Sequence, residues 1–157
     1  MRISESPAEL ELRAELRAYF SKLMTPEIYA ATRNVESGPV YHEVVRQLGR
    51  DGWLGLSWPK EYGGQGRSTI EQYLFADEAQ RAGFPFPFLT ISTVGPTIQQ
   101  YGSDEQKREF LAPALSGEKV AALAISEPNA GSDVASITTS ASAGTSRSTS
   151  QSTGRSR

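Results

Sequence analysis

In this chain of 157 residues, the segment AISEPNAGSD, residues 124–133, marks a change from an apolar to a polar sequence. An apolar run precedes it, and this run predicts a short β-strand over residues 120–126. The run ends in a polar turn that contains proline, glycine and two serines, Ser126 and Ser132. Such a turn can present backbone N–H groups and hydroxyls to an anionic or heterocyclic ligand. An ordinary strand-to-loop connection is the plainer alternative, and the chemistry of the turn alone leaves both open.

Five helical patterns precede this segment and predict a mainly α fold. The first has Ser6 as its N-cap, Pro7 in the first helical position and Glu9 three residues after the cap, and it ends before Pro26. The other four helices are expected over residues 40–50, from residue 69, over residues 91–101, and from residue 104 to a closing glycine at 117. Residues 1–118 are therefore expected to form a helical bundle.

Aromatic residues between the helices are expected to hold loops against the core. Trp53 and Trp58 lie among many glycines and prolines in residues 51–66, so this segment cannot form a long regular element. We interpret the two tryptophans as core anchors rather than as ligand-stacking residues. The run FPFPF at residues 84–88 is expected to cover the helical core.

The end of the chain has the composition of a disordered segment. Residues 140–157 contain seven serines, three threonines and three arginines, and no apolar residue larger than alanine. They cannot bury enough surface to offset the entropy of ordering, so a disordered tail is expected. Residues 119–139 lie between the bundle and this tail and are expected to be the truncated start of a β domain.

Composition narrows the classes of function. Residues 1–139 carry all 18 acidic and 13 of the 16 basic side chains, a net charge of −5, which argues against a nucleic-acid-binding surface. The absence of cysteine excludes disulfides and thiol chemistry and suits a cytoplasmic location. With a single histidine, His42, no metal site is expected. No apolar run approaches the roughly 20 residues of a membrane span.

Four segments, in the same order along the chain, resemble the acyl-CoA dehydrogenase family. They are residues 51–59, 60–64, 101–107 and 126–133, and the last of them is the most specific. The resemblance extends over residues 3–139 and is to the actinobacterial type associated with steroid or other bulky acyl-CoA substrates. It implies an N-terminal helical domain, a middle β-barrel and a C-terminal four-helix bundle.

The resemblance also implies a chemistry. Family members bind FAD, remove the α-proton of an acyl-CoA thioester, pass the β-hydride to flavin N5 and deliver electrons to an electron-transfer flavoprotein. By position, Ile125 and Ser126 would lie beside the flavin ring. Gly131 and Ser132 would contact the flavin or its phosphates, and Ser132 would also be a candidate contact for the acyl-CoA substrate. As an alternative to covering the helical core, the FPFPF run at residues 84–88 would line the binding site of the acyl chain.

No residue of this chain matches the family's catalytic carboxylate, which lies beyond the position of residue 139. We therefore expect a truncated dehydrogenase with no catalytic residue of its own, inactive alone, that forms a homo-oligomer or a hetero-oligomer. The alternative is a non-catalytic subunit that associates with a full-length dehydrogenase chain. We hypothesise that residues 140–157 are translated out of frame, because shifted codons for residues 151–156 allow the sequence that the family has after this point.

Overall fold

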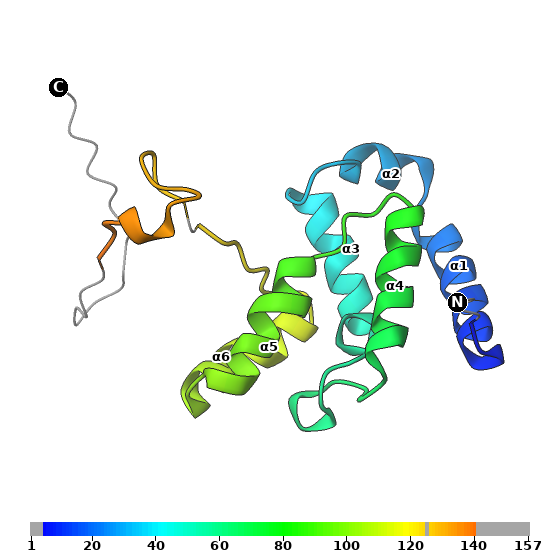
Figure 1. The fold of residues 1–157 in the computed structure, drawn as a ribbon. Coiled ribbons are helices and arrows are strands. Elements are labelled where there is room, and N and C mark those ends of the chain that lie inside the picture. The colour runs from blue at the N-terminus through cyan, green and yellow to red at the C-terminus, as the bar shows by residue number, and fades with distance from the viewer. Residues whose placement is uncertain (1–4, 125, 141–157) are drawn as a thin grey trace. The chain divides into compact units, whose positions relative to one another are not determined.

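The computed structural model describes residues 5–124 and 126–140 (Figure 1). Its α-helices are α1 (Pro7–Leu23), α2 (Pro26–Thr32), α3 (Pro39–Arg50), α4 (Thr69–Arg81), α5 (Gly95–Tyr101) and α6 (Asp104–Leu115). Shorter helical turns are Trp53–Gly55, Lys60–Tyr62 and Val134–Ser136, and a π-helical segment, η3, spans Leu89–Val94. The chain divides into two compact units, with the boundary along the sequence between Ala122 and Leu123. The helices of the first unit confirm the predicted mainly α fold.

Local capping explains where the predicted helices begin. Ser6, Ser68 and Ser103 each accept a hydrogen bond from a backbone N–H three residues later, and the residue at that position bonds back to the cap. The prediction missed α2, because Pro26 was interpreted only as the end of α1. Instead Thr25 caps a new helix and Pro26 occupies its first turn, where the missing N–H is harmless.

Aromatic side chains form much of the core of the helical unit, in which α1 packs against α4, α2 against α3, and α5 against α6 (Figure 1). The Phe75 ring stacks on Trp53 at 6.0 Å between centroids and meets Phe20 and Phe86 at 5.7 and 5.2 Å. Trp53 is 9% exposed, which confirms its predicted role as an anchor. The prediction for the FPFPF run was partly wrong, since Phe84 and Phe86 are buried but Phe88 is 58% exposed.

Trp58 explains why the predicted helix over residues 91–101 begins as a π-helix. The Gly95 N–H bonds to the carbonyl of Thr90, five residues earlier, and the next residue, Pro96, has no N–H to continue this pattern. The Trp58 indole N–H donates to the Ile91 carbonyl at 2.9 Å instead. A Cβ at Gly95 would lie 2.1 Å from the Trp58 ring, so only glycine permits this contact. Trp58 is 2% exposed and is thus confirmed as a core anchor.

A network of charged side chains joins α1 to α4. Arg13 binds Glu5, Asp77 and Glu78 with N–O distances of 2.5, 2.6 and 2.5 Å, and Arg17 binds Glu78 at 3.0 Å. The Glu78 side chain is only 3% exposed. Burial acts to raise the pKa of Glu78, but the hydrogen bonds from Arg17 and Arg13 outweigh it and leave this pKa below its ordinary value. The Arg13 guanidinium likewise lowers the pKa of Asp77.

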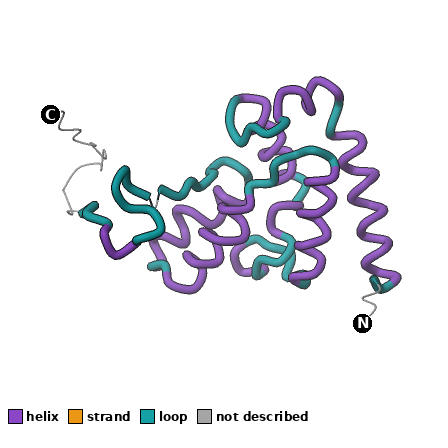
Figure 2. The backbone as a smooth tube through the Cα atoms, turned by 45° about the horizontal axis from the view of Figure 1, so that its top comes forward, coloured by secondary structure: helices purple, strands orange, loops and turns teal. Residues whose placement is uncertain are grey.

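The strand predicted over residues 120–126 was wrong for the described residues of that segment. The residues that the structure describes contain no β-strand (Figure 2), only an isolated bridge between Glu127 and Ala130. A strand needs a neighbouring strand to accept its backbone groups, and none is present among them. The segment is instead held to the π-helix by a hydrogen bond, in which the Ala121 N–H donates to the Thr90 hydroxyl at 2.9 Å. Ile125 and the predicted disordered residues 141–157 lie outside the described residues.

Thr90→Val is expected to release the segment that leads out of the helical unit. Thr90 is 1% exposed, and its hydroxyl accepts the Ala121 N–H. Losing this acceptor should lower the free energy of unfolding by about 1 kcal/mol and speed hydrogen exchange of the Ala121 amide. Thr93→Val, at an exposed position in the same π-helix, is the control and should change stability by less than about 0.5 kcal/mol. Unchanged exchange at Ala121 in Thr90→Val would contradict this role.

Candidate functional site

The second unit contains a loop, residues 126–139, that carries the predicted ligand contacts. Glu127 and Ala130 exchange two backbone hydrogen bonds, of 2.7 and 3.1 Å, and so close a tight turn around Pro128 and Asn129. Ala130 is 3% exposed. A second turn follows, in which the Ser136 N–H donates to the Asp133 carbonyl at 3.2 Å and the Ser136 hydroxyl binds the Asp133 carboxylate. The loop is therefore built from two hydrogen-bonded turns.

The carboxylate of Glu127 joins the start of this loop to its end. It accepts the backbone N–H of Thr138 at 3.1 Å and that of Thr139 at 2.6 Å, and it also accepts both threonine hydroxyls. These hydrogen bonds, led by the one from the Thr139 hydroxyl, lower the pKa of Glu127 to about 2. A carboxylate that is so acidic and so fully engaged is a poor proton acceptor. Glu127 therefore has a structural role, joining the two ends of the loop, and is not a candidate for the catalytic base.

The structure places the described predicted contacts between or beside the two turns. Gly131 and Ser132 are the residues that separate the turns, and Ser126 precedes the first; all three are exposed. Among the described residues, the backbone N–H groups of Gly131 and Ser132 and the two serine hydroxyls have no hydrogen-bond partner. Apart from its two chain neighbours, no described residue has an atom within 4 Å of the position that a Cβ of Gly131 would take, so its backbone is open to close approach.

This donor set fits the phosphate part of a flavin dinucleotide. Backbone N–H groups and hydroxyls donate to phosphate oxygens without needing a cation. The residues that would hold such a group are Gly131 and Ser132, with the hydroxyl of Ser126 available to a polar ring edge. Ile125, the fourth predicted contact, lies outside the described residues.

Sequence reasoning missed the part of the site that shapes it. From the sequence no role was assigned to Glu127, whereas the structure makes it the acceptor for Thr138 and Thr139. The available signal was a glutamate followed, eleven and twelve residues later, by two consecutive threonines. A spacing of this kind has no helical or strand periodicity, so no pattern rule detects it.

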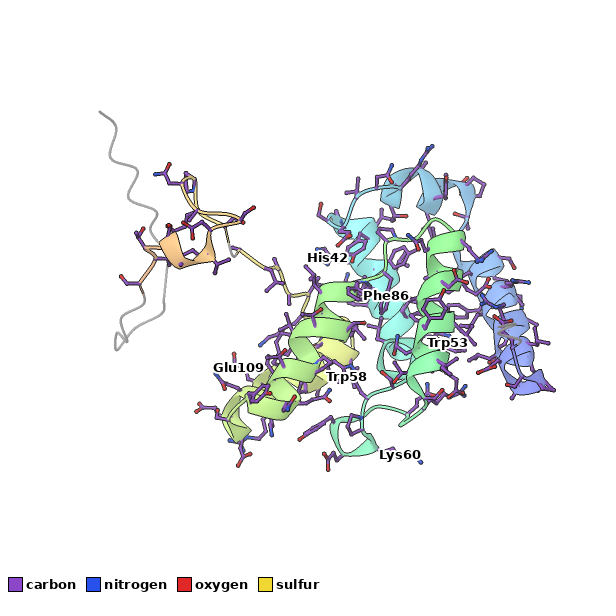
Figure 3. The ribbon with its side chains drawn as sticks, in the orientation of Figure 1. His42, Trp53, Trp58, Lys60, Phe86 and Glu109 are labelled. Carbon is purple, nitrogen blue, oxygen red and sulfur yellow. The ribbon has the colours of Figure 1, made fainter. Side chains whose placement is uncertain are left out.

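The helical unit contains pockets between its helices. One pocket of about 420 Å³ lies between α5 and α6, and another of about 630 Å³ lies between α1 and α4. In Figure 3 Trp53 and Phe86 lie among the helices, whereas Lys60 and Glu109 lie at the periphery. Within residues 5–124 and 126–140, no three His, Cys, Asp or Glu side chains are grouped to hold a metal ion. None of the described helices combines the length and the apolar character needed to cross a membrane.

Comparisons with known proteins agree on one family. Residues 6–118 match the family described as acyl-CoA dehydrogenase, N-terminal domain. Acyl-CoA dehydrogenase FadE26 of Mycobacterium tuberculosis is 54% identical over 145 residues, which is 90% of this chain and 36% of that protein. The chain therefore spans about a third of the length of this relative.

Solved structures give the same result. The ChsE4-ChsE5 complex from Mycobacterium tuberculosis contains a chain with 55% identity and a TM-score of 0.79, and the match covers 87% of this chain and 35% of that one. The Tcur3481-Tcur3483 steroid ACAD has 55% identity and a TM-score of 0.80, with coverage of 88% and 36%.

Proposed function

Because the chain belongs to the acyl-CoA dehydrogenase family, we propose that it supplies the helical N-terminal part and the first flavin-contacting loop of a dehydrogenase for bulky, steroid-type acyl-CoA thioesters. The observation that carries this proposal is the loop of residues 126–139, which exposes Gly131 and Ser132 between two hydrogen-bonded turns. The substrate class is supported by 55% identity to a structure named as a steroid ACAD.

The proposed roles of the individual residues follow from the donor set. Gly131 and Ser132 would bind the phosphates of FAD through backbone N–H groups and a hydroxyl, and Ser132 would also be within reach of the acyl-CoA substrate. Ser126 and Ile125 would lie beside the flavin ring. When bound, FAD supplies the acceptor for the substrate hydride, and an electron-transfer flavoprotein would be the next electron acceptor.

We also propose that this chain does not catalyse the reaction alone. The proton acceptor needed for removal of the α-proton is not found in the loop, because the Glu127 carboxylate is held by Thr138 and Thr139 and its pKa is lowered to about 2. Asp133 is bonded to Ser136. The base would therefore come from outside this loop. The cytoplasmic location remains a prediction.

A second candidate function is that of a non-catalytic subunit. The two solved structures cited above are each named for two proteins, ChsE4 with ChsE5 and Tcur3481 with Tcur3483. Under this alternative, the chain associates with a complete dehydrogenase subunit and stabilises it. Size measurement after co-expression with such a subunit tests this alternative, since it requires a stable heteromer. A chain that stays apart from the complete subunit would contradict it.

A chimaera tests the first function directly. In it, residues 6–139 replace the matching part of FadE26, which is 54% identical to this chain. The chimaera is expected to retain FAD and to oxidise the acyl-CoA that FadE26 oxidises, and Ser132→Ala should lower its kcat/KM about tenfold by removing a hydrogen bond to a charged group. Ser37→Ala, at an exposed loop position, is the matched control. A folded chimaera without flavin, or turnover by the isolated chain, would contradict the proposal.

A further inference from the structure

Among the described residues of the second unit, Glu127 makes the most concentrated set of polar contacts. Its two carboxylate oxygens accept hydrogen bonds from two backbone N–H groups and two hydroxyls, all of them from Thr138 and Thr139. An ionised carboxylate has about four lone-pair sites, so this set of donors satisfies it. The contacts join residues eleven and twelve positions apart and turn the segment between them into a closed loop.

The closed loop fixes both neighbours of the predicted ligand contacts. On one side, the backbone pair between Glu127 and Ala130 ends directly before Gly131. On the other side, the turn from Asp133 to Ser136 begins directly after Ser132. Gly131 and Ser132 therefore lie between two hydrogen-bonded turns, and the Glu127 carboxylate joins the outer ends of the segment that contains both turns. The hydrogen bonds of this carboxylate go to Thr138 and Thr139, not to Gly131 or Ser132.

We propose that Glu127 is a positioning residue, which closes the loop of residues 127–139 and so holds the Gly131 and Ser132 donors ready for a phosphate-bearing ligand. This inference rests on the proposed function for the identity of the ligand, the pyrophosphate of FAD. Preorganisation of this kind lowers the entropy that the ligand must remove on binding. Glu127 touches neither the reacting atoms nor the cofactor in this role.

The chemistry of the contact requires a glutamate. A glutamine keeps the shape of the side chain but has one acceptor oxygen, and its amide group would face the threonine donors. An aspartate keeps the charge but is one methylene shorter. Glu127→Gln is therefore expected to open the loop, and Glu127→Asp is expected to close it partly. Glu118→Gln removes the same charge from an exposed position in the other unit and is the matched control.

The amide NMR signals of the full chain near neutral pH measure the closure of the loop. Glu127→Gln should shift the signals of Thr138 and Thr139, and also those of Gly131 and Ser132, while the helical signals stay in place. Glu118→Gln should leave all four loop signals unchanged. Unshifted Gly131 and Ser132 signals in Glu127→Gln would overturn the proposal, because the loop would then keep its shape without the carboxylate.

Inorganic pyrophosphate is the probe for the ligand side. It should perturb the Gly131 and Ser132 signals of the wild-type chain, and Glu127→Gln should weaken the apparent Kd about tenfold if the open loop is populated at about 90%. Partial recovery by Glu127→Asp would separate positioning from a general loss of structure. If Glu127→Gln opens the loop and binds pyrophosphate like wild type, the positioning role is wrong and the cofactor site stands. If the wild-type loop is closed and pyrophosphate changes nothing, the proposed cofactor contact is wrong, and the positioning role falls with it.

Discussion

Replacing Trp58 with alanine is expected to lower the free energy of unfolding of the helical unit by about 3–5 kcal/mol. The side chain is 2% exposed, its ring fills the space beside Gly95, and its indole N–H supplies the hydrogen bond to the Ile91 carbonyl. Alanine would leave a cavity and an unsatisfied carbonyl together. This loss is a large fraction of the stability of a typical domain, so urea unfolding followed by circular dichroism should show a midpoint at a clearly lower urea concentration than that of the wild-type chain.

Two further substitutions separate the causes of this effect. Trp58→Phe keeps most of the apolar volume but removes the indole N–H, so it isolates the hydrogen bond to Ile91, with an expected loss of about 1–3 kcal/mol. Tyr101→Ala removes a large ring that is 76% exposed and should change stability by less than about 0.5 kcal/mol. Equal losses for Trp58→Ala and Tyr101→Ala would show that Trp58 is not a core anchor.

Replacing Arg13 with methionine is expected to lower the free energy of unfolding by about 3 kcal/mol. Arg13 binds Asp77 and Glu78, and the Glu78 carboxylate is 3% exposed, so the substitution leaves a buried charge with Arg17 as its remaining partner. Methionine retains the apolar volume of the arginine stem, which limits the effect to the lost charge pairs. Arg81→Met removes an exposed partner of Asp77 and should change stability by less than about 1 kcal/mol.

The same network should make stability depend on pH. The pKa values of Asp77 and Glu78 are lowered in the folded chain, so their contribution is present above the ordinary pKa of about 4 and is lost as the pH falls through the lowered values. The free energy of unfolding of the wild-type chain should therefore decrease below about pH 4. Arg13→Met should show a shallower decrease, because its carboxylates titrate closer to their ordinary values. Identical pH slopes for both chains would contradict this account.

The sequence was sufficient where the determinants of structure are local. Ser6, Ser68 and Ser103 each lie three residues before an acidic or amide side chain, and a helix begins at each of them. The π-helix could not be predicted, because it depends on a contact between Trp58 and Ile91, which lie far apart in the sequence. The strand over residues 120–126 was predicted from an apolar run alone, but a strand also requires a partner that the run does not specify.

The candidate site, too, was only partly predictable from the sequence. The polar turn predicted that hydroxyls and backbone N–H groups could be presented to a ligand, and the structure leaves Ser126, Gly131 and Ser132 exposed. Their assignment to a cofactor stays a proposal. The Glu127 contacts with Thr138 and Thr139 were not predictable, because they depend on how the intervening turns bring the ends of the loop together.

The hydrogen bond between Thr90 and Ala121 has a practical consequence for protein engineering. This hydrogen bond holds the end of the helical unit to its π-helix. The second unit begins two residues later, at Leu123. A junction between Ala122 and Leu123 keeps the capping boxes, the Trp58 contact and the Arg13 network together in the helical unit. It also keeps the Glu127 loop intact in the second unit. Helical segments and loops from different homologues could therefore be recombined here without cutting through any of these interactions.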